Sequence, residues 1–172
     1  MGVMAAFIFA AQMVNFPVLG GTSGHFMGGV LAAVLLGPFM GVLIMTTVLI
    51  VQCLVFQDGG ITALGANVFN MGLVGVLGGY AVYTVSYAIM KRFNSRSAMA
   101  VSAFGAGWCS IVLASAACAV ELAVSGVMPL RAALVPMAGI HAVIGIGEGV
   151  ITVLVLGFVA KLRPDLLSLR KI

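Results

Sequence analysis

An uncharged run extends from Phe26 to Phe56 and sets the first limit on how this chain can fold. As one straight helix it would be roughly 46 Å long, whereas the hydrocarbon core of a bilayer is about 30 Å thick. The dipeptide Gly37-Pro38 lies inside the run, and proline inside a helix removes a hydrogen bond and clashes with the preceding turn. We therefore expect a short helix over 26–36 and a full membrane span over 38–56.

The composition extends this conclusion to the whole chain. Hydrophobic residues make up 63% of the sequence and charged residues only 7%, whereas a soluble domain carries about 25% charged residues. Such a chain cannot cover a globular surface with polar groups, so we expect a single integral membrane domain over 1–172 in a lipid bilayer. The net charge of +4 lies in short basic clusters at helix ends. This is typical of membrane topology signals and argues against nucleic acid as a partner.

The remaining apolar stretches complete an all-α bundle of six transmembrane helices, one of them short. "QDGG" at 57–60 and "KRFNSR" at 91–96 separate the stretches as loops. The expected helices lie near 1–16, 26–36, 38–56, 61–90, 97–124 and 132–160, and a basic tail follows at 161–172.

Basic residues predict the orientation of this bundle. They fall in the 91–96 loop and in the tail, and only Arg131 lies elsewhere. Because cytoplasmic loops are enriched in Lys and Arg, both basic segments are expected inside the cell. If the short 26–36 helix crosses the membrane, His25 lies outside and Met1 inside; if it only dips, His25 lies inside. We favour crossing, with both chain ends in the cytoplasm.

His25 is the main candidate for chemistry. It sits in the glycine-rich stretch "GGTSGHFMGG" at 20–29, at the expected start of a helix. An ionisable residue inside a membrane protein is a functional candidate by default, and neutral imidazole is the commonest transition-metal ligand. The alternative is a histidine that caps a helix or bonds a carbonyl group. Thr22 and Ser23 are possible cavity or second-shell residues beside it.

Four more polar residues lie within apolar segments. His141 and Glu148 are seven residues apart and share a helix face, so they are either two ligands or a buried hydrogen-bonded pair. Asn67 and Asn70 are three apart and also share a face, where they line a cavity or join helices. Asp58 is expected to cap a helix or turn.

Several other chemistries find no support in the sequence. Cys53, Cys109 and Cys118 lie in apolar runs without a C-x-x-C pair, so we interpret them as small buried residues. "GIGEG" at 145–149 lacks the strand–turn–helix context of a nucleotide-binding loop. There is no P-loop and no protease-like arrangement. The chain is therefore expected not to be an enzyme, and ATP-driven transport would need an ATPase in another subunit.

Three segments carry a specific resemblance: "NFPVLGGTSGHFMGGVLAAVLLGP", "DGGITALGANVFNMG" and "GIHAVIGIGEGVIT". They resemble the CbiM/NikM family, the substrate-specific membrane (S) subunits of energy-coupling factor (ECF) transporters for cobalt or nickel. The resemblance spans nearly the whole chain. It implies an S-component fold in the cell membrane of a bacterium or archaeon. It also implies uptake of Co²⁺ or Ni²⁺ with a transmembrane T subunit, paired ATPase A subunits and, in the cobalt branch, a small N subunit.

The same resemblance implies a nearly planar nitrogen site. Its ligands are the N-terminal amine, the amide and imidazole of a histidine at the second position, and the histidine of the G-T-[ST]-G-H motif, which is His25 here. Planar nitrogen coordination suits Ni²⁺ and then Co²⁺, and disfavours Mg²⁺ and Ca²⁺. The sequence departs from the family at its start, where Gly2 replaces that histidine. We therefore expect the chain to lack the family's Met-His loop and first helix.

Two alternative functions remain open at this point. One is a truncated scaffold or assembly subunit without a competent metal site, and the other is an S component for another small substrate. A rebuilt, weaker metal site could use His25 with Asn67, Asn70, His141 or Glu148. The sequence does not decide whether cobalt or nickel is the transported ion. No permanently bound cofactor is expected. A link to cobalamin biosynthesis is expected only if cobalt is the transported ion.

Overall fold

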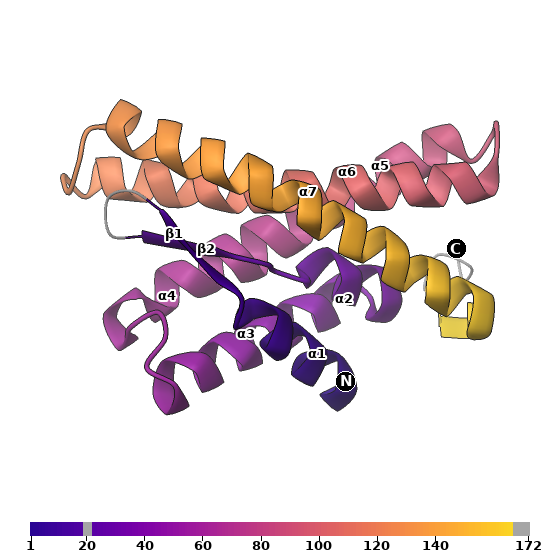
Figure 1. The fold of residues 1–172 in the computed structure, drawn as a ribbon, viewed down its shortest axis with the longest axis horizontal. Helices are drawn as coiled ribbons and strands as arrows, with labels where there is room; N and C mark the ends of the chain where they lie inside the picture. Colours follow the sequence, from indigo (N-terminus) through magenta and orange to yellow (C-terminus); the bar gives the residue numbers. More distant parts are fainter. Residues whose placement is uncertain (19–21, 167–172) are drawn as a thin grey trace.

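The computed structural model describes residues 1–18 and 22–166, and it is predominantly α-helical, which confirms the expected fold class (Figure 1). Within the described residues, 4 helical stretches are long and apolar enough to cross a membrane: Pro38–Val55, Ile61–Met90, Ser97–Val124 and Leu130–Leu162. The α-helices are α1 (Gly2–Gln12), α2 (Gly29–Leu36), α3 (Pro38–Val55), α4 (Leu64–Asn67), α5 (Val76–Met90), α6 (Ser95–Val124) and α7 (Leu130–Leu162).

A β-hairpin replaces part of the first two expected helices. The helix expected over 1–16 ends at Gln12, and the one expected over 26–36 begins only at Gly29 and has 8 residues. Between them, β1 (Asn15–Val18) and β2 (Thr22–His25) pair antiparallel, with Asn15 opposite His25. Gly24 lets β2 approach α7 closely, because a Cβ at this position would lie 2.6 Å from Ile144 Cδ1.

Glycine and proline mark the breaks between the later helices. Gly37 adopts φ +95° directly before Pro38, which opens α3. In the 57–60 turn, Gly59 and Gly60 have φ angles of +88° and +61°. These left-handed conformations favour glycine and end the preceding helical run.

The long stretch after this turn is helical but not uniform. It begins with a 3₁₀ turn (Ile61–Ala63), continues through α4, and widens into a π-helix (Val68–Gly75) before α5. A π-helical segment within an α-helix is rare and is often found at functional sites. Here it carries Asn70 on its buried side.

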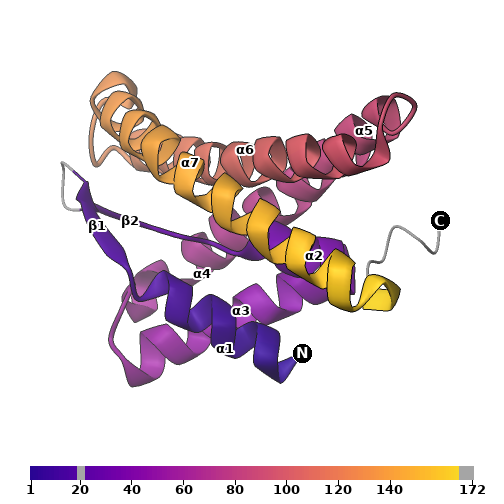
Figure 2. The ribbon, with the colours of Figure 1, turned by 45° about the vertical axis from the view of Figure 1, so that its right-hand side comes forward.

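The helices form two layers with a short helix between them. Figure 2 shows α5, α6 and the first half of α7 on one side, α1 and α3 on the other, and α2 with β2 between the layers. In α2, the side chains of Val30, Leu31 and Val34 are at most 1% exposed. The interior of the molecule is therefore filled by the short helix that the hairpin leads into.

The chain ends and the loops separate into two groups. The start of α1, the end of α7 and the connection between α5 and α6 lie toward one end of the molecule, whereas the hairpin strands, the α3–α4 connection and the α6–α7 connection lie toward the other (Figure 1). The hairpin and α2 therefore return the chain toward the end from which α1 started. The expected basic tail begins within α7 and a short 3₁₀ turn (Pro164–Leu166), and its residues 167–172 lie outside the described part of the chain.

Candidate metal site

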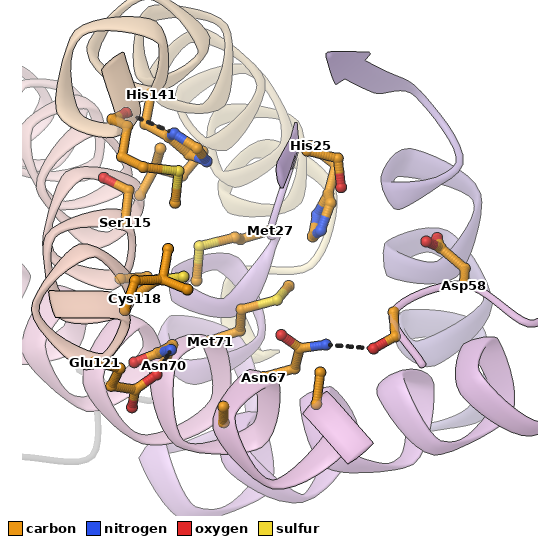
Figure 3. Close-up of a pocket in the computed structure, with 18 of the residues that line it drawn as sticks. His25, Met27, Asp58, Asn67, Asn70, Met71, Ser115, Cys118, Glu121 and His141 are labelled. Atoms are coloured by element: carbon orange, nitrogen blue, oxygen red, sulfur yellow. Dashed lines mark hydrogen bonds between the residues drawn. The ribbon is translucent and has the colours of Figure 1, made fainter. Parts of the chain in front are cut away.

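A cavity of about 560 Å³ lies between the hairpin, the 58–71 stretch, α6 and α7 (Figure 3). Of the residues singled out in the sequence, Ser23, His25, Asn67, Asn70 and His141 all line it. Residues far apart in the chain therefore meet around one space. Its volume is within the range of small-ligand sites, about 300–1,000 Å³.

His25 lies at the end of β2. The sequence predicts the start of a helix at this position, and α2 begins only at Gly29. Its Nδ1 lies 3.2 Å from the carbonyl oxygen of Phe26. A carbonyl only accepts hydrogen bonds, so Nδ1 donates and the lone pair of Nε2 is left for a ligand. Desolvation lowers the pKa of His25, against weaker opposing effects of the Phe26 carbonyl and Asp58. The imidazole is therefore neutral at pH 7, the form that binds metals.

His141 approaches the same cavity from α7 with the same tautomer. Its Nδ1 donates to the carbonyl oxygen of Met137 at 2.7 Å, so Nε2 carries the lone pair when the ring is neutral. Nε2 faces β2, since a Cβ at Gly24 would lie only 3.2 Å from it. The cavity lining thus contains two imidazoles, each oriented by a main-chain carbonyl group.

Side-chain oxygen atoms lie on the side of the cavity that is formed by the π-helix and α6. The Nδ2 group of Asn70 donates to Glu121 Oε2 at 2.7 Å, while its Oδ1 is buried without a hydrogen-bond partner. Asn67 donates from Nδ2 to the carbonyl oxygen of Gly59 at 3.4 Å. Asn70 therefore both lines the cavity and joins two helices, the two roles that the sequence left open.

Asp58 does not have the capping role expected for it. The following 3₁₀ turn has Gly60 at its N-cap and no side-chain cap bond. The Asp58 side chain instead belongs to the cavity lining, as does that of Glu121. The part of the lining that the structure describes holds these two carboxylates and no lysine or arginine, so the cavity favours a cation.

Glu148 and Thr22 stand apart from the other candidates. Glu148 does not belong to the described lining and is 2% exposed. Its carboxylate accepts hydrogen bonds from the backbone N–H groups of Met27 at 3.0 Å and Gly28 at 2.8 Å. Both of its oxygens therefore accept from the backbone, and the hydrogen bonds that the structure describes join Glu148 to this segment rather than to His141. Thr22 lies in β2, but its side chain is outside the described part of the structure.

The sequence interpretation missed several lining residues. Glu121 was detectable, because a lone carboxylate within an apolar helix is a functional candidate. Cys118, interpreted as a small buried residue, is half-buried and lines the cavity, and three methionines do so as well: Met27, Met71 and Met137. Scattered methionines carry no positional signal in a sequence, because they are also common in packed cores.

The described residues do not form a complete metal centre by themselves. Within 1–18 and 22–166, no three His, Cys, Asp or Glu side chains lie close enough together to hold one ion. A transition metal at His25 would therefore take its other ligands from backbone, amide or water donors, or from another segment. The arrangement provides oriented imidazoles, a negatively charged lining and space for further ligands.

The fold and the cavity together define a polytopic helical membrane protein with a cation-favouring pocket. The chain belongs to the CbiM family, described as the cobalt uptake substrate-specific transmembrane region, whose model matches residues 1–166.

Individual relatives agree with this assignment. The chain is 49% identical over 169 residues to a protein of Archaeoglobus fulgidus that carries the name of a fused nickel transport protein, NikMN; the match covers 97% of this chain and 55% of the relative. It is 34% identical to the cobalt transport protein CbiM of Sorangium cellulosum, over 97% of this chain and 75% of the relative. The chain thus spans about half the length of the fused relative.

A solved structure supports the same fold. The crystal structure of a transition metal transporter superposes with a TM-score of 0.82 at 34% identity, covering 93% of this chain and 74% of that chain. Relatives of this chain are therefore named as cobalt and nickel transport proteins, and a solved transition metal transporter shares its fold.

Proposed function

We propose that this protein is the substrate-binding membrane subunit of an ECF-type importer for Co²⁺ or Ni²⁺. The observation that carries the proposal is the position of His25 at the end of β2, where the Phe26 carbonyl orients its ring toward the cavity. The described part of the cavity lining contains two carboxylates and no lysine or arginine. The cobalt and nickel transport names of its relatives support the same cargo. The protein itself is not an enzyme in this proposal, and partner subunits hydrolyse ATP.

His25 is the proposed nitrogen ligand from the described chain. In the family that the sequence resembles, a Met-His terminus contributes the remaining nitrogen ligands. This chain has Gly2 at the second position, so the other ligands at His25 come from backbone, amide or water donors or from another segment. In this proposal, Asn67, Asn70 and His141 form part of the cavity wall around the ion and do not bind it directly. Ser23 lies beside His25 on the lining and serves as a neighbouring polar group.

The proposed partners follow from the same assignment. A transmembrane T subunit and paired ATPase subunits drive transport, and an N-type subunit takes part in the cobalt branch. The cation is captured at the hairpin end of the molecule, outside the cell membrane of a bacterium or archaeon, and delivered inward. Supporting this direction, the α5–α6 connection and the end of α7, two segments that carry basic residues, lie toward the opposite end (Figure 1).

Thermal unfolding in detergent with single cations tests the proposal. The protein is produced from its native locus, and its intact mass is compared with 17.6 kDa, so that the N-terminus present is known. A ligand that binds only the native state at a hundredfold excess over Kd stabilises it by about 2.7 kcal/mol. We expect Ni²⁺ and Co²⁺ to raise the Tm and Mg²⁺ to leave it unchanged, because the ligands are nitrogen atoms.

Two variants assign the response to the site. His25→Ala should abolish the shift caused by Ni²⁺, whereas Thr47→Ala, on the exposed face of α3 and outside the cavity lining, should retain it. A cation-independent Tm in the wild type would contradict the proposal and favour a scaffold or assembly subunit. An equal response of His25→Ala would place the metal elsewhere.

A further inference from the structure

Glu148 is a buried carboxyl group that the proposed metal site does not use. It lies in the middle of α7 with 2% of its surface exposed, and its two side-chain oxygens accept from two consecutive backbone amides, Met27 N at 3.0 Å and Gly28 N at 2.8 Å. These partners are 121 and 120 residues away in the sequence. Two hydrogen bonds from one side chain to consecutive amides fix the position of that backbone, since a buried N–H group that loses its acceptor costs about 1–3 kcal/mol.

The segment that Glu148 holds connects His25 to α2. Residues 26–28 have no regular secondary structure, and Gly28, at φ +68°, is the N-cap of α2. Negative charge is favourable at a helix N-terminus, where free N–H groups and the helix dipole meet. Gln12 of α1 holds the same segment from the other layer, since its Nε2 donates to the Met27 carbonyl oxygen at 3.0 Å. Both polar groups of the Met27 backbone are therefore bound by buried side chains.

The glycines around Glu148 explain how a short side chain reaches this segment. A Cβ at Gly147 would lie 2.8 Å from the ring of Phe26, the residue directly after His25. A Cβ at Gly145 would lie 2.9 Å from Trp108, and one at Gly149 would lie 2.7 Å from Phe104. The stretch "GIGEG" thus lets α6 and the 26–28 segment approach α7 from different sides. The contact of Phe26 at Gly147 brings the 26–28 segment against α7, where its amides meet the Glu148 side chain, whereas the contacts at Gly145 and Gly149 join α7 to α6.

We propose that Glu148 is a positioning residue for the metal site, which sets the position of His25 by binding the backbone of Met27 and Gly28. The inference rests on the proposed function, in which His25 is a metal ligand. Met27 is only two residues from His25, so a shift of the bound amides moves the imidazole relative to the cavity. Metal sites lose affinity when supporting hydrogen bonds are removed, typically about 10- to 100-fold.

Glu148→Gln in the full chain tests this inference. Glutamine keeps the size of the side chain but replaces one accepting oxygen by an NH₂ donor, which faces a backbone N–H and cannot bond to it. We expect the Ni²⁺ affinity to fall about tenfold or more, and the d–d absorption of the bound ion to change because the imidazole has moved. Amide hydrogen exchange over residues 22–28 should become faster in the metal-free protein.

Trp108→Phe is the matched control. It removes the hydrogen bond from Trp108 Nε1 to the Ala142 carbonyl oxygen, 2.9 Å long, which also joins α6 to α7 but does not touch the 26–28 segment. We expect a lower Tm with unchanged Ni²⁺ affinity, unchanged absorption and unchanged exchange over 22–28. If Glu148→Gln does not fold, Glu148→Asp keeps the charge, shortens the side chain and is measured instead.

The outcomes separate the two proposals. If Glu148→Gln has the Ni²⁺ affinity, the absorption and the amide exchange of the wild type, the positioning role is wrong. It is also wrong if both variants lose Ni²⁺ affinity in proportion to their loss of Tm. A wild type that binds neither Ni²⁺ nor Co²⁺ overturns the proposed function. Exchange over 22–28 then decides by itself whether Glu148 fixes the His25 backbone.

Discussion

Glu121 shows how one side chain can serve both the packing and the charge of the cavity. It accepts the hydrogen bond of Asn70 Nδ2 at 2.7 Å, which ties α6 to the π-helix, and it supplies one of the two described carboxylates of the lining. These two contributions depend on different properties of the group. The hydrogen bond needs an accepting oxygen, whereas attraction of a cation needs the negative charge.

Replacing Glu121 by glutamine separates these contributions. The amide oxygen of glutamine can still accept from Asn70, so the Tm in detergent should change little. Loss of one charge facing a divalent cation across a partly hydrated cavity should weaken Co²⁺ or Ni²⁺ binding about fivefold, or about 1 kcal/mol. Isothermal titration at low ionic strength measures this, and an affinity equal to the wild type would show that Glu121 does not act on the cation.

The sequence allowed part of this site to be predicted at the residue scale. His25, Asn67, Asn70 and His141 are polar residues in apolar surroundings, and such residues need a partner or a cavity in a membrane protein. The role of Glu148 could not be predicted, because its partners are backbone N–H groups. Every non-proline residue has that group, so no pattern of side chains indicates which amides a buried carboxylate will bind.

At the scale of elements, glycine determines how closely α6 and α7 cross. A Cβ at Gly107 would lie 3.2 Å from Gly149 Cα and 3.3 Å from Gly149 N, so the two backbones are nearly in contact. Small residues at membrane helix crossings allow this approach, since lipid provides no hydrophobic drive for association. The close crossing keeps the α7 face that carries His141 and Glu148 near the centre of the molecule.

Gly107→Val and Gly105→Val form a matched pair that tests this crossing. Valine at position 107 would meet backbone atoms of α7, which cannot move aside as a flexible side chain can, and should cost about 1–3 kcal/mol of stability. At position 105 a Cβ meets nothing within 4 Å, so the same substitution two residues away should have little effect. Thermal unfolding in one detergent compares them, and equal Tm values would contradict a tight crossing.

The boundaries of helices could be predicted where glycine or proline ends them. They could not be predicted where contacts between distant parts of the chain determine them. The interruption before Pro38 and the turn at 57–60 follow from local backbone preferences. The hairpin does not, because "NFPV" and "TSGH" lack the alternation of a typical strand pair. β2 lies against α7 at Gly24, a contact with Ile144 and His141 that the sequence alone does not reveal.

For the whole molecule, the important feature is that the start of α1 and the end of α7 lie opposite the hairpin. The connection between α5 and α6 carries Lys91 and Arg92 and lies toward the end of α7, whereas the α6–α7 connection lies at the hairpin end (Figure 1). Combined with the enrichment of basic residues in cytoplasmic loops, this arrangement predicts the side of each loop.

Reporter fusions test the predicted orientation. A fluorescent protein joined to the C-terminus should fluoresce, since it folds in the cytoplasm. Alkaline phosphatase inserted at Gly126 should be active, because that connection is expected outside, and the same reporter inserted at Phe93 should be inactive. The reverse pattern would place the cavity entrance in the cytoplasm and would contradict uptake from outside.

The buried short helix has a further consequence for transport. Asp58 and Ser125, in connections at the hairpin end, line the cavity, whereas α2 fills the space between the layers on the side away from the hairpin, with buried side chains such as Val30 and Leu31. In the described part of the chain, a hydrophobic helix therefore closes the cavity on that side, and the cavity is not a continuous pore. An ion held at His25 can reach the opposite side of the membrane only if α2 is displaced or if the whole subunit reorients in the bilayer.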